Sequence, residues 1–310
     1  MFLIIYEEGD MDKPECFKFK VNNTHKLAFF NSIGKRFSFL LDYKTNTKIT
    51  FGNDEKEYYI SDMSPDGEFV ATIQNTYEHK DRKLKIIRIK TQEIVFETNS
   101  FFIYEILFTP VPNLIICRAD VKGRTKVFVF NFNTNEIIYK FPRQHPLEYG
   151  EVNFENNTFI LPAIKRGQVV LFNFNTLEAM PLKIPTANII QRVKQINSDH
   201  LFVIDSDFFA IKANFKNVLW KTKLDLWYLC YAPYFFIYEN KAFFEYRFFF
   251  IDLDNGKIES IQPILEGKIG LIYKYFDDCV MDPFGTIFNL KTKEFSKFNI
   301  EEYLDKQMKG

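Results

Sequence analysis

The sequence repeats one hairpin pattern seven times along its length. Each copy has an apolar strand, a short polar turn and a second apolar strand, and the copies span residues 39–51, 86–96, 128–139, 171–182, 210–220, 249–261 and 287–298. The residues that mark the turns are Thr45, Thr91, Thr134, Thr176, Phe215, Asn255 and Thr292, with successive spacings of 46, 43, 42, 39, 40 and 37 residues. This regularity constrains the fold strongly, because each repeat must be one supersecondary unit that packs against its neighbours.

A period near 40 residues, with several strands per period, is typical of a β-propeller built from four-stranded blades. In front of each hairpin lies a turn followed by another apolar strand, at 22–30, 64–73, 110–117, 156–161, 198–204, 233–238 and 277–281. We therefore expect an all-β fold, a single β-propeller domain over residues 1–310 with seven four-stranded blades. The expected blades span residues 15–52, 57–97, 101–142, 147–184, 187–222, 226–262 and 267–299.

The second blade contains a well-formed tight turn made of Ser64, Pro65, Asp66 and Gly67. Proline fixes φ and glycine supplies a positive φ, so this tetrapeptide suits a tight turn. It closely resembles the turn that opens the second strand in many WD40-like and related propeller blades, although the WD and GH dipeptides are absent. The resemblance implies the wider propeller superfamily at the level of the fold.

The two ends of the chain offer two ways to close the ring. Residues 1–7 form an apolar strand that we expect to pair with the last blade, because joining the terminal strands hides open strand edges. Residues 294–298 are the alternative outer strand of that blade, and residues 300–310 begin with a helical pattern.

Composition limits the classes of function. The 310 residues carry no net charge, which argues against binding a polyanion with the whole surface. The four cysteines lack a CxxC spacing, the N-terminus lacks the features of a signal peptide, and no apolar stretch reaches the roughly 18–20 residues of a membrane span. We therefore expect a cytoplasmic, soluble protein, monomeric on its own, with no membrane association.

No strong catalytic or metal-binding motif is present, so we expect no catalytic residue, no metal site and no cofactor. The four histidines, His25, His79, His145 and His200, fall in different blades. The segment 252–259 has part of a calcium-loop spacing, but Asn255 and Gly256 are also favoured in a two-residue hairpin turn, and we expect the turn.

Basic residues gather in the predicted loops between the second and third strands of blades one to four. They are Lys35, Arg36, Lys80, Arg82, Lys83, Arg118, Lys122, Arg124, Lys126, Lys165 and Arg166, which together with Glu78, Asp81 and Asp120 give +8. The equivalent loops of blades five to seven hold Asp205, Asp207, Glu239, Glu245 and Asp282 against Lys241 and Arg247, which gives −3. Because these loops open on one face of a propeller, the pattern predicts a polarised face that steers an acidic partner. The alternative is an ordinary solvated surface.

A second candidate surface is aromatic. Residues 226–253 include thirteen Phe, Tyr or Trp side chains in 28 positions. Blades lie between neighbours, so packing can bury both of their faces, and packing is the favoured interpretation. The alternative is a partner-binding patch that contains Trp227, Tyr228, Tyr231 and Tyr234.

These features favour a non-enzymatic protein–protein interaction module, because loops on a rigid scaffold collect binding sites. The expected partner is another protein, of acidic character, bound by a scaffold subunit of a larger assembly or by an antidote-type protein that neutralises a toxin. One alternative is a propeller enzyme, such as a hydrolase, lactonase or lyase, with its site at the central channel. The other is nucleic-acid binding through the basic loops of blades one to four.

Overall fold

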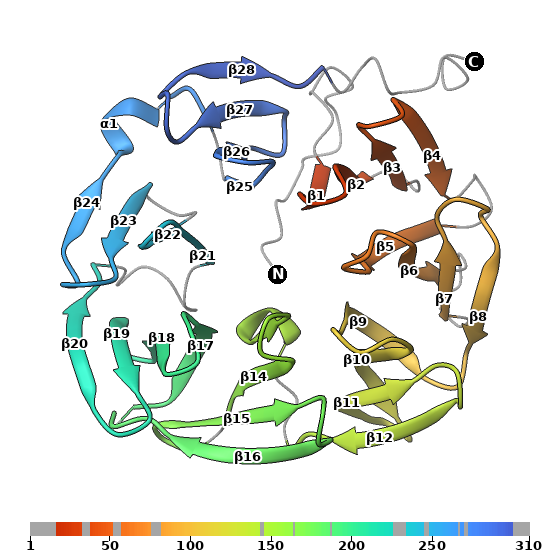
Figure 1. Ribbon diagram of the computed structural model, residues 1–310, viewed down its shortest axis with the longest axis horizontal. Coiled ribbons are helices and arrows are strands. Elements are labelled where there is room, and N and C mark those ends of the chain that lie inside the picture. The colour runs from red at the N-terminus through yellow and green to blue at the C-terminus, as the bar shows by residue number, and fades with distance from the viewer. Residues whose placement is uncertain are drawn as a thin grey trace.

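The protein forms a ring of seven β-sheets around a central axis, as the computed structural model shows (Figure 1). The structure describes residues 17–32, 38–51, 57–75, 82–142, 146–163, 165–186, 188–225, 234–244, 248–265, 267–269 and 272–299. Each sheet is one blade of four consecutive antiparallel strands, with the first strand nearest the axis and the fourth at the rim (Figure 1). The all-β, seven-bladed propeller predicted from the repeat is confirmed.

The strands of blades one to four are β1 (Phe17–Asn22), β2 (Leu27–Ser32), β3 (Ser38–Asp42), β4 (Thr47–Phe51), β5 (Glu57–Met63), β6 (Phe69–Asn75), β7 (Lys83–Arg88), β8 (Ile94–Thr98), β9 (Phe102–Phe108), β10 (Leu114–Val121), β11 (Arg124–Asn131), β12 (Glu136–Lys140), β13 (Glu151–Asn153), β14 (Thr158–Pro162), β15 (Gln168–Asn173) and β16 (Glu178–Lys183). Those of blades five to seven are β17 (Ile190–Gln195), β18 (His200–Asp205), β19 (Phe209–Asn214), β20 (Val218–Lys223), β21 (Phe235–Tyr238), β22 (Lys241–Phe244), β23 (Phe249–Asp252), β24 (Ile258–Ser260), β25 (Tyr273–Lys274), β26 (Cys279–Met281), β27 (Thr286–Asn289) and β28 (Phe295–Lys297). The described residues add a 3-10 turn, η1 (Leu147–Tyr149), and one helical turn, α1 (Gln262–Leu265). No described helix has the length and apolar character needed to cross a membrane.

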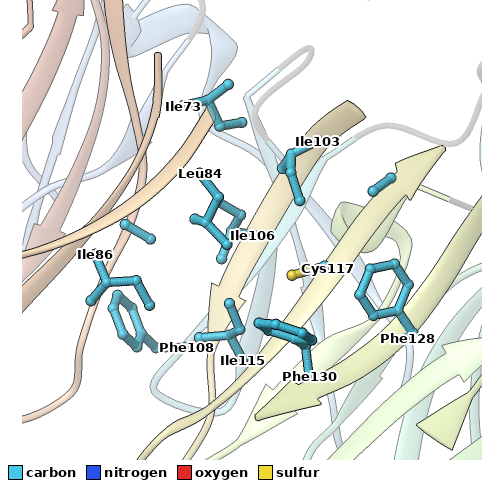
Figure 2. Close-up of a cluster of buried hydrophobic side chains, with 12 residues drawn as sticks. Ile73, Leu84, Ile86, Ile103, Ile106, Phe108, Ile115, Cys117, Phe128 and Phe130 are labelled. Carbon is cyan, nitrogen blue, oxygen red and sulfur yellow. The ribbon is translucent and has the colours of Figure 1, made fainter. Parts of the chain in front are cut away.

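Seven separate hydrophobic cores hold the blades together, one between each pair of neighbours. Figure 2 shows the core between the second and third blades, where Ile86 lies beside Phe108 and the cluster extends to Phe128. Alternate side chains of one strand serve different cores: Phe244 packs toward the fifth blade, and Phe243 packs toward the seventh. Because both faces of a blade are buried, near-continuous apolar strands are stable here. Each fully buried Phe contributes about 1.5–3 kcal/mol.

The repeated hairpins are the third and fourth strands of the blades, as predicted. In six blades an Asn or Asp ends the third strand, and its Oδ1 accepts two backbone N–H groups of the turn. These residues are Asp42, Asn131, Asn173, Asn214, Asp252 and Asn289. Such side chains stabilise turns by satisfying donors that no strand partner reaches. The segment after Asp252 is a hairpin turn as predicted, but it is longer than the expected two-residue turn. The N–H of Asp252 donates to the carbonyl oxygen of Lys257 at 3.0 Å across residues 253–256, and of Asn255 and Gly256 only the glycine has a positive φ.

The predicted second strands match the structure in six blades. In the second blade the turn from Ser64 to Gly67 directly precedes β6: Ser64 accepts the N–H of Gly67 at 3.0 Å, and Gly67 has a φ of 70°. In the sixth blade the prediction was wrong, because residues 233–238 were expected to form the second strand. Phe235–Tyr238 is the first strand, β21, and a two-residue turn at Glu239 and Asn240 leads into β22.

Polar side chains join the inner strands of neighbouring blades. Asn31, which is 2% exposed, accepts the N–H of Ile60 and donates to its carbonyl oxygen, both at 2.9 Å. Three carboxylates of inner strands each accept a backbone N–H of the next blade. The pairs are Asp62 with Phe108, Glu105 with Leu147, and Glu151 with Gln195, at 2.8, 2.8 and 2.9 Å. Each blade contact therefore combines an apolar core with buried hydrogen bonds near the axis in this part of the ring.

The first and seventh blades meet through side chains. Phe298 stacks on Phe30 with ring centroids 5.2 Å apart, and the hydroxyl groups of Tyr43 and Tyr275 lie 2.7 Å apart. Among the described strands, β28 is the outer strand of the seventh blade, which is the alternative that the sequence offered, and no strand pairs across this contact. The expected closing strand at residues 1–7 and the expected helix at 300–310 lie outside the described residues.

Candidate functional site

The loops between second and third strands open on the same face as the connections between blades, because alternate strands of an antiparallel blade run in opposite directions. We call this the connection face. Of the basic residues predicted on it, Lys35, Arg36 and Lys80 lie outside the described residues. Of the other eight, Lys126 is half-buried on β11, and the remaining seven fall into two groups that differ in their contacts.

Four of these cations are exposed on adjacent blades. Lys122 and Arg124 belong to the hairpin between β10 and β11, where Lys122 and Gly123 both have positive φ, as a two-residue turn requires. Lys165 and Arg166 belong to the loop between β14 and β15. None of the four is in an ion pair with a described residue. We call these four residues the basic loop group.

The other three cations are held by contacts within and between blades. Arg82 donates to the carbonyl oxygen of Ile103 at 2.8 Å, and its guanidinium lies 4.6 Å from the ring centroid of Phe102. Lys83 pairs with Glu97 at 3.0 Å, and this hydrogen bond lowers the pKa of Glu97. Arg118 lies 3.7 Å from Glu105 and is half-buried. Their charges therefore contribute less to the open surface than the sequence predicted.

Fewer of the acidic side chains predicted for blades five to seven are exposed on the connection face than the sequence suggested. Asp205 is fully buried and accepts the N–H groups of Asp207 and Phe209, and Asp282, 3% exposed, accepts two N–H groups of its own turn. Glu239 and Lys241 lie at the opposite face, because the loop that contains Glu239 joins first and second strands. Glu245 and Arg247 lie outside the described residues.

Most of the aromatic run is core. Phe235, Phe236, Phe249 and Phe250 are buried in the contacts of the sixth blade with its two neighbours, which confirms the packing interpretation for these residues. Trp227, Tyr228 and Tyr231 lie outside the described residues. Tyr234 is half-buried, and its ring centroid lies 4.0 Å from the guanidinium of Arg192.

The structure brings together a set of polar side chains around the ring axis that the sequence did not reveal. The axial cluster consists of Lys18, Tyr59, Glu105, Glu148, Arg192 and Tyr234, which come from the first strand of a blade or from the residues just before it. Lys18, Tyr59 and Arg192 lie in the first half of their strands, Glu148 and Tyr234 precede theirs, and Glu105 lies at the middle of β9. Their only signal in the sequence is a charged or phenolic residue near the start of otherwise apolar strands.

Arg192 anchors the axial cluster. It is 5% exposed and donates to the carbonyl oxygen of Glu148 at 2.8 Å. Its guanidinium lies 4.0 Å from the ring centroid of Tyr234 and 4.8 Å from that of Tyr149. Stacking on aromatic faces and hydrogen bonding stabilise a buried guanidinium. The arginine thereby joins the fifth blade to η1, which precedes the fourth blade, and to Tyr234, which precedes the sixth.

The electrostatics of the axial cluster follow from its crowding. Burial raises the pKa of Glu105, and the nearby carboxylate of Glu148 adds to this rise. Burial also raises the pKa of Tyr234, as does its hydrogen bond to Glu148. The pKa of Lys18 is raised because the attraction of Tyr59 and the two glutamates outweighs the effect of burial. Perturbed groups gathered in this way mark a candidate binding site.

Within the described ranges, no group of three or more His, Cys, Asp or Glu side chains converges as metal ligands. The thiol of Cys117 is fully buried, and burial raises its pKa, so it is an inert core residue.

The geometry defines a seven-bladed β-propeller with polar side chains around its axis. No family model and no curated protein matches the sequence. The fold is similar to that of an uncharacterized protein, lmo1340, from Listeria monocytogenes EGD-e, with 13% identity, a TM-score of 0.61, and 91% of this chain and 94% of that chain covered. It is also similar to the β-propeller domain of Cps50 (Swd1) from Myceliophteria thermophila, with 11% identity, a TM-score of 0.59, and 93% and 97% covered.

A third similar structure is the dihydro-heme d1 dehydrogenase NirN in complex with DHE. The identity is 11%, the TM-score is 0.59, and the match covers 85% of this chain and 61% of that chain. Identities this low show the fold alone. The resemblance to WD40-like propellers that the sequence predicted is confirmed at that level.

Proposed function

We propose that this propeller is a non-enzymatic interaction module that binds an acidic protein through the connection face of its third and fourth blades. The single observation that carries the proposal is the basic loop group: four exposed cations on adjacent blades, with no ion pair among the described residues. Surface charges of one sign that protein carboxylates do not neutralise raise the rate of encounter with an acidic partner and favour the correct orientation.

Two further features support this choice. The loop between β10 and β11 has only two residues at its tip, so its cations are presented on a rigid hairpin. In the fifth and seventh blades, Asp205 and Asp282 are buried inside their turns, so neither is presented to a partner at the surface, although Asp207 is exposed. A rigid scaffold lowers the entropic penalty of binding, because little ordering is needed.

The role in the cell that fits best is a subunit of a larger assembly, or an antidote-type binder that blocks a toxin. In both roles the propeller supplies a preformed surface and the partner supplies carboxylates. Nucleic acid is the competing polyanion, and treatment of the lysate with nuclease separates it from an acidic protein.

The test is capture of partners from the native lysate by two tagged variants of equal charge. The first variant reverses the basic loop group, with Lys122→Glu, Arg124→Glu, Lys165→Glu and Arg166→Glu. The control reverses four exposed lysines in the turns on the opposite face, with Lys44→Glu, Lys216→Glu, Lys257→Glu and Lys291→Glu. Both variants should melt close to the unmodified protein, because the replaced side chains are at the surface.

We expect the first variant to recover about tenfold less of the main partner than the control, which corresponds to about 1.4 kcal/mol. Binding of the unmodified protein should also weaken when salt is raised from 0.05 to about 0.5 M, because the Debye length falls below about 10 Å. Equal recovery by both variants, with both folded, would rule out the basic loop group as the contact surface.

A further inference from the structure

The turn between the second and third strands contains a residue with positive φ in several blades. In the fourth and seventh blades this residue is a glycine, Gly167 at 64° and Gly285 at 84°, but in the fifth blade it is Phe208 at 56°. The positions are equivalent, because in each of these blades the carbonyl oxygen of this residue accepts the N–H of the residue that follows the fourth strand. A bulky side chain disfavours a positive φ, so the ring of Phe208 has to make contacts that a glycine would lack.

The ring of Phe208 lies at a cavity on the connection face. Phe208 packs against the core between the fifth and sixth blades, and it lines a cavity of about 340 Å³ together with Lys223, Leu224 and Asp225. Leu224 is buried and Phe208 is half-buried, whereas Lys223 and Asp225 are exposed. Apolar side chains therefore form the inner wall of the cavity, and two opposite charges lie at its edge. The cavity belongs to the connection face, because Phe208 follows a second strand and Asp225 follows a fourth.

Hydrogen bonds connect this cavity with the basic loop group of the neighbouring fourth blade (Figure 1). Gly167, which directly follows the two cations of that blade, donates its N–H to the carbonyl oxygen of Asn188 at 2.7 Å. The side-chain amide of Asn188 donates to the carboxylate of Asp207, the neighbour of Phe208, at 3.0 Å. Ile189 comes next to Asn188 and is 39% exposed. The basic loop and the cavity are thus parts of one continuous surface, with an exposed apolar side chain between them.

The size and the lining of the cavity indicate what it can hold. Pockets for small ligands span about 300–1,000 Å³, so a cavity of about 340 Å³ suits one large side chain better than a cofactor. The charges of Lys223 and Asp225 offset each other, so burial of apolar surface is the main attraction. In protein interfaces, large side chains that fill such pockets contribute much of the binding energy.

We propose that the cavity at Phe208 binds one large apolar side chain, a tryptophan, phenylalanine or leucine, of the acidic partner. This inference rests on the proposed function and adds a chemical requirement: the partner carries an exposed apolar residue beside its carboxylates. The two parts of the surface have different roles. The basic loop group raises the rate of encounter, and the filled cavity lowers the rate of dissociation.

Phe248 provides a matched control. It has the same turn position in the sixth blade, with a φ of 46°, and its carbonyl oxygen accepts the N–H of Ile261 at 2.7 Å. Phe248 is also half-buried, but it is not among the described residues that line the cavity. Phe208→Gly and Phe248→Gly therefore remove the same side chain from the same backbone conformation, and they differ in the cavity.

The probe is a library of random peptides displayed on phage and selected on the intact protein. We expect the selected peptides to be enriched in Asp and Glu and to share one Trp, Phe or Leu. The tightest peptide and its variant with alanine in place of the apolar residue are then labelled and compared by fluorescence anisotropy. Thermal melting confirms that each protein variant is folded, and Phe208→Asn, which also tolerates a positive φ, replaces Phe208→Gly if the glycine variant unfolds.

The unmodified protein and Phe248→Gly should bind the selected peptide about tenfold more tightly than its alanine variant. Phe208→Gly should bind the two peptides with nearly equal affinity, because the wall of the cavity is lost. The variant with the reversed basic loop group should bind both peptides more weakly and keep the ratio between them.

Four outcomes would overturn the cavity as the anchor site. They are a selection that enriches no peptide, acidic peptides that share no apolar residue, a ratio unchanged in folded Phe208→Gly, and an equal loss of the ratio in Phe248→Gly. Acidic peptides without a shared apolar residue would overturn the cavity alone and leave the proposed function standing. Apolar peptides without acidic residues, bound equally by the variant with the reversed basic loop group, would overturn the proposed function and this inference with it.

Discussion

Replacement of Asn31 by alanine should loosen the contact between the first and second blades. The amide of Asn31 satisfies both backbone groups of Ile60, at 2.9 Å each, and its oxygen also accepts the hydroxyl of Ser38 at 2.5 Å. Asn31 and Ile60 are almost completely buried, so water does not replace the amide without opening the contact. The variant therefore leaves a buried N–H and a buried C=O without partners.

The size of the effect follows from these two groups. Each orphaned buried group costs about 1–3 kcal/mol, and some relaxation is expected, so the loss should be about 2–4 kcal/mol. For a chain of 310 residues the unfolding entropy is about 0.65 kcal/mol/K, which makes 1 kcal/mol equal to about 1.5 °C in Tm. Asn31→Ala should therefore lower Tm by about 3–6 °C, measured by circular dichroism at 218 nm, the wavelength of strand signal.

Asn22 provides a matched control between the same two blades. Its amide donates to the carbonyl oxygens of Ser64 and Pro65, at 3.2 and 3.1 Å, but this contact lies at a partly exposed edge. Its oxygen also accepts the N–H of His25 at 3.1 Å, and water can replace both the lost donor and the lost acceptor at this edge, so Asn22→Ala should cost about 1 kcal/mol or less. If Asn31→Ala lowers Tm no more than Asn22→Ala does, buried hydrogen bonds near the axis do not hold these blades together.

Three further predictions concern turns and ring closure, and thermal melting checks each. Gly67→Ala should lower stability by about 1–2 kcal/mol, because Gly67 has a φ of 70° and an added Cβ would lie 2.8 Å from Cγ of His25; an unchanged Tm would contradict the required positive φ. Leu177→Asn should raise stability by about 0.5–1 kcal/mol, because Leu177 is exposed with a φ of 57° and the first and third blades carry asparagine at this turn position. A lower Tm would show that the contacts of the leucine side chain stabilise the fold by more than its positive φ destabilises it. Asp277→Asn should remove about 0.5 kcal/mol or less, because Lys26 and Asp277 form an exposed pair. The hydrogen bond from Lys26 lowers the pKa of Asp277 below its ordinary 3.8. The pair therefore stabilises the fold above that pH and loses its effect as the pH falls through the lowered pKa. A difference in Tm between the Asp277→Asn variant and the unmodified protein that grows in acid would contradict this reasoning.

The ring was predictable because each blade repeats the same local chemistry. Turns that need an αL residue or an Asx side chain can be recognised in the sequence, because residues such as Asn131 and Asp252 recur where each turn begins. The sixth blade misled the prediction because β21 and β22 are both apolar on both faces and are joined by only two residues, Glu239 and Asn240. Without polar alternation, the sequence pattern does not indicate which strand comes first.

The candidate sites were predictable in part. The basic loop group follows from charge in loops, which the sequence displays directly. The structural use of Asp205 was harder to predict, because an aspartate that caps its own turn has the same sequence pattern as one at the surface. The axial cluster could not be predicted, because the first six blades supply one member each and only the closed ring brings Lys18 near Glu105 and Glu148.

Each described sheet consists of one continuous stretch of chain, and this has a mechanical consequence. Six of the seven contacts between blades are spanned by the chain itself, so a blade that separates there stays tethered within a short reach and reassociates as an intramolecular event. Between the seventh and first blades, the described contacts are side chains such as Phe298 on Phe30 and Lys26 with Asp277. No connection of the chain joins the seventh blade to the first, so covalent bonds restrain transient opening of the ring least at that contact.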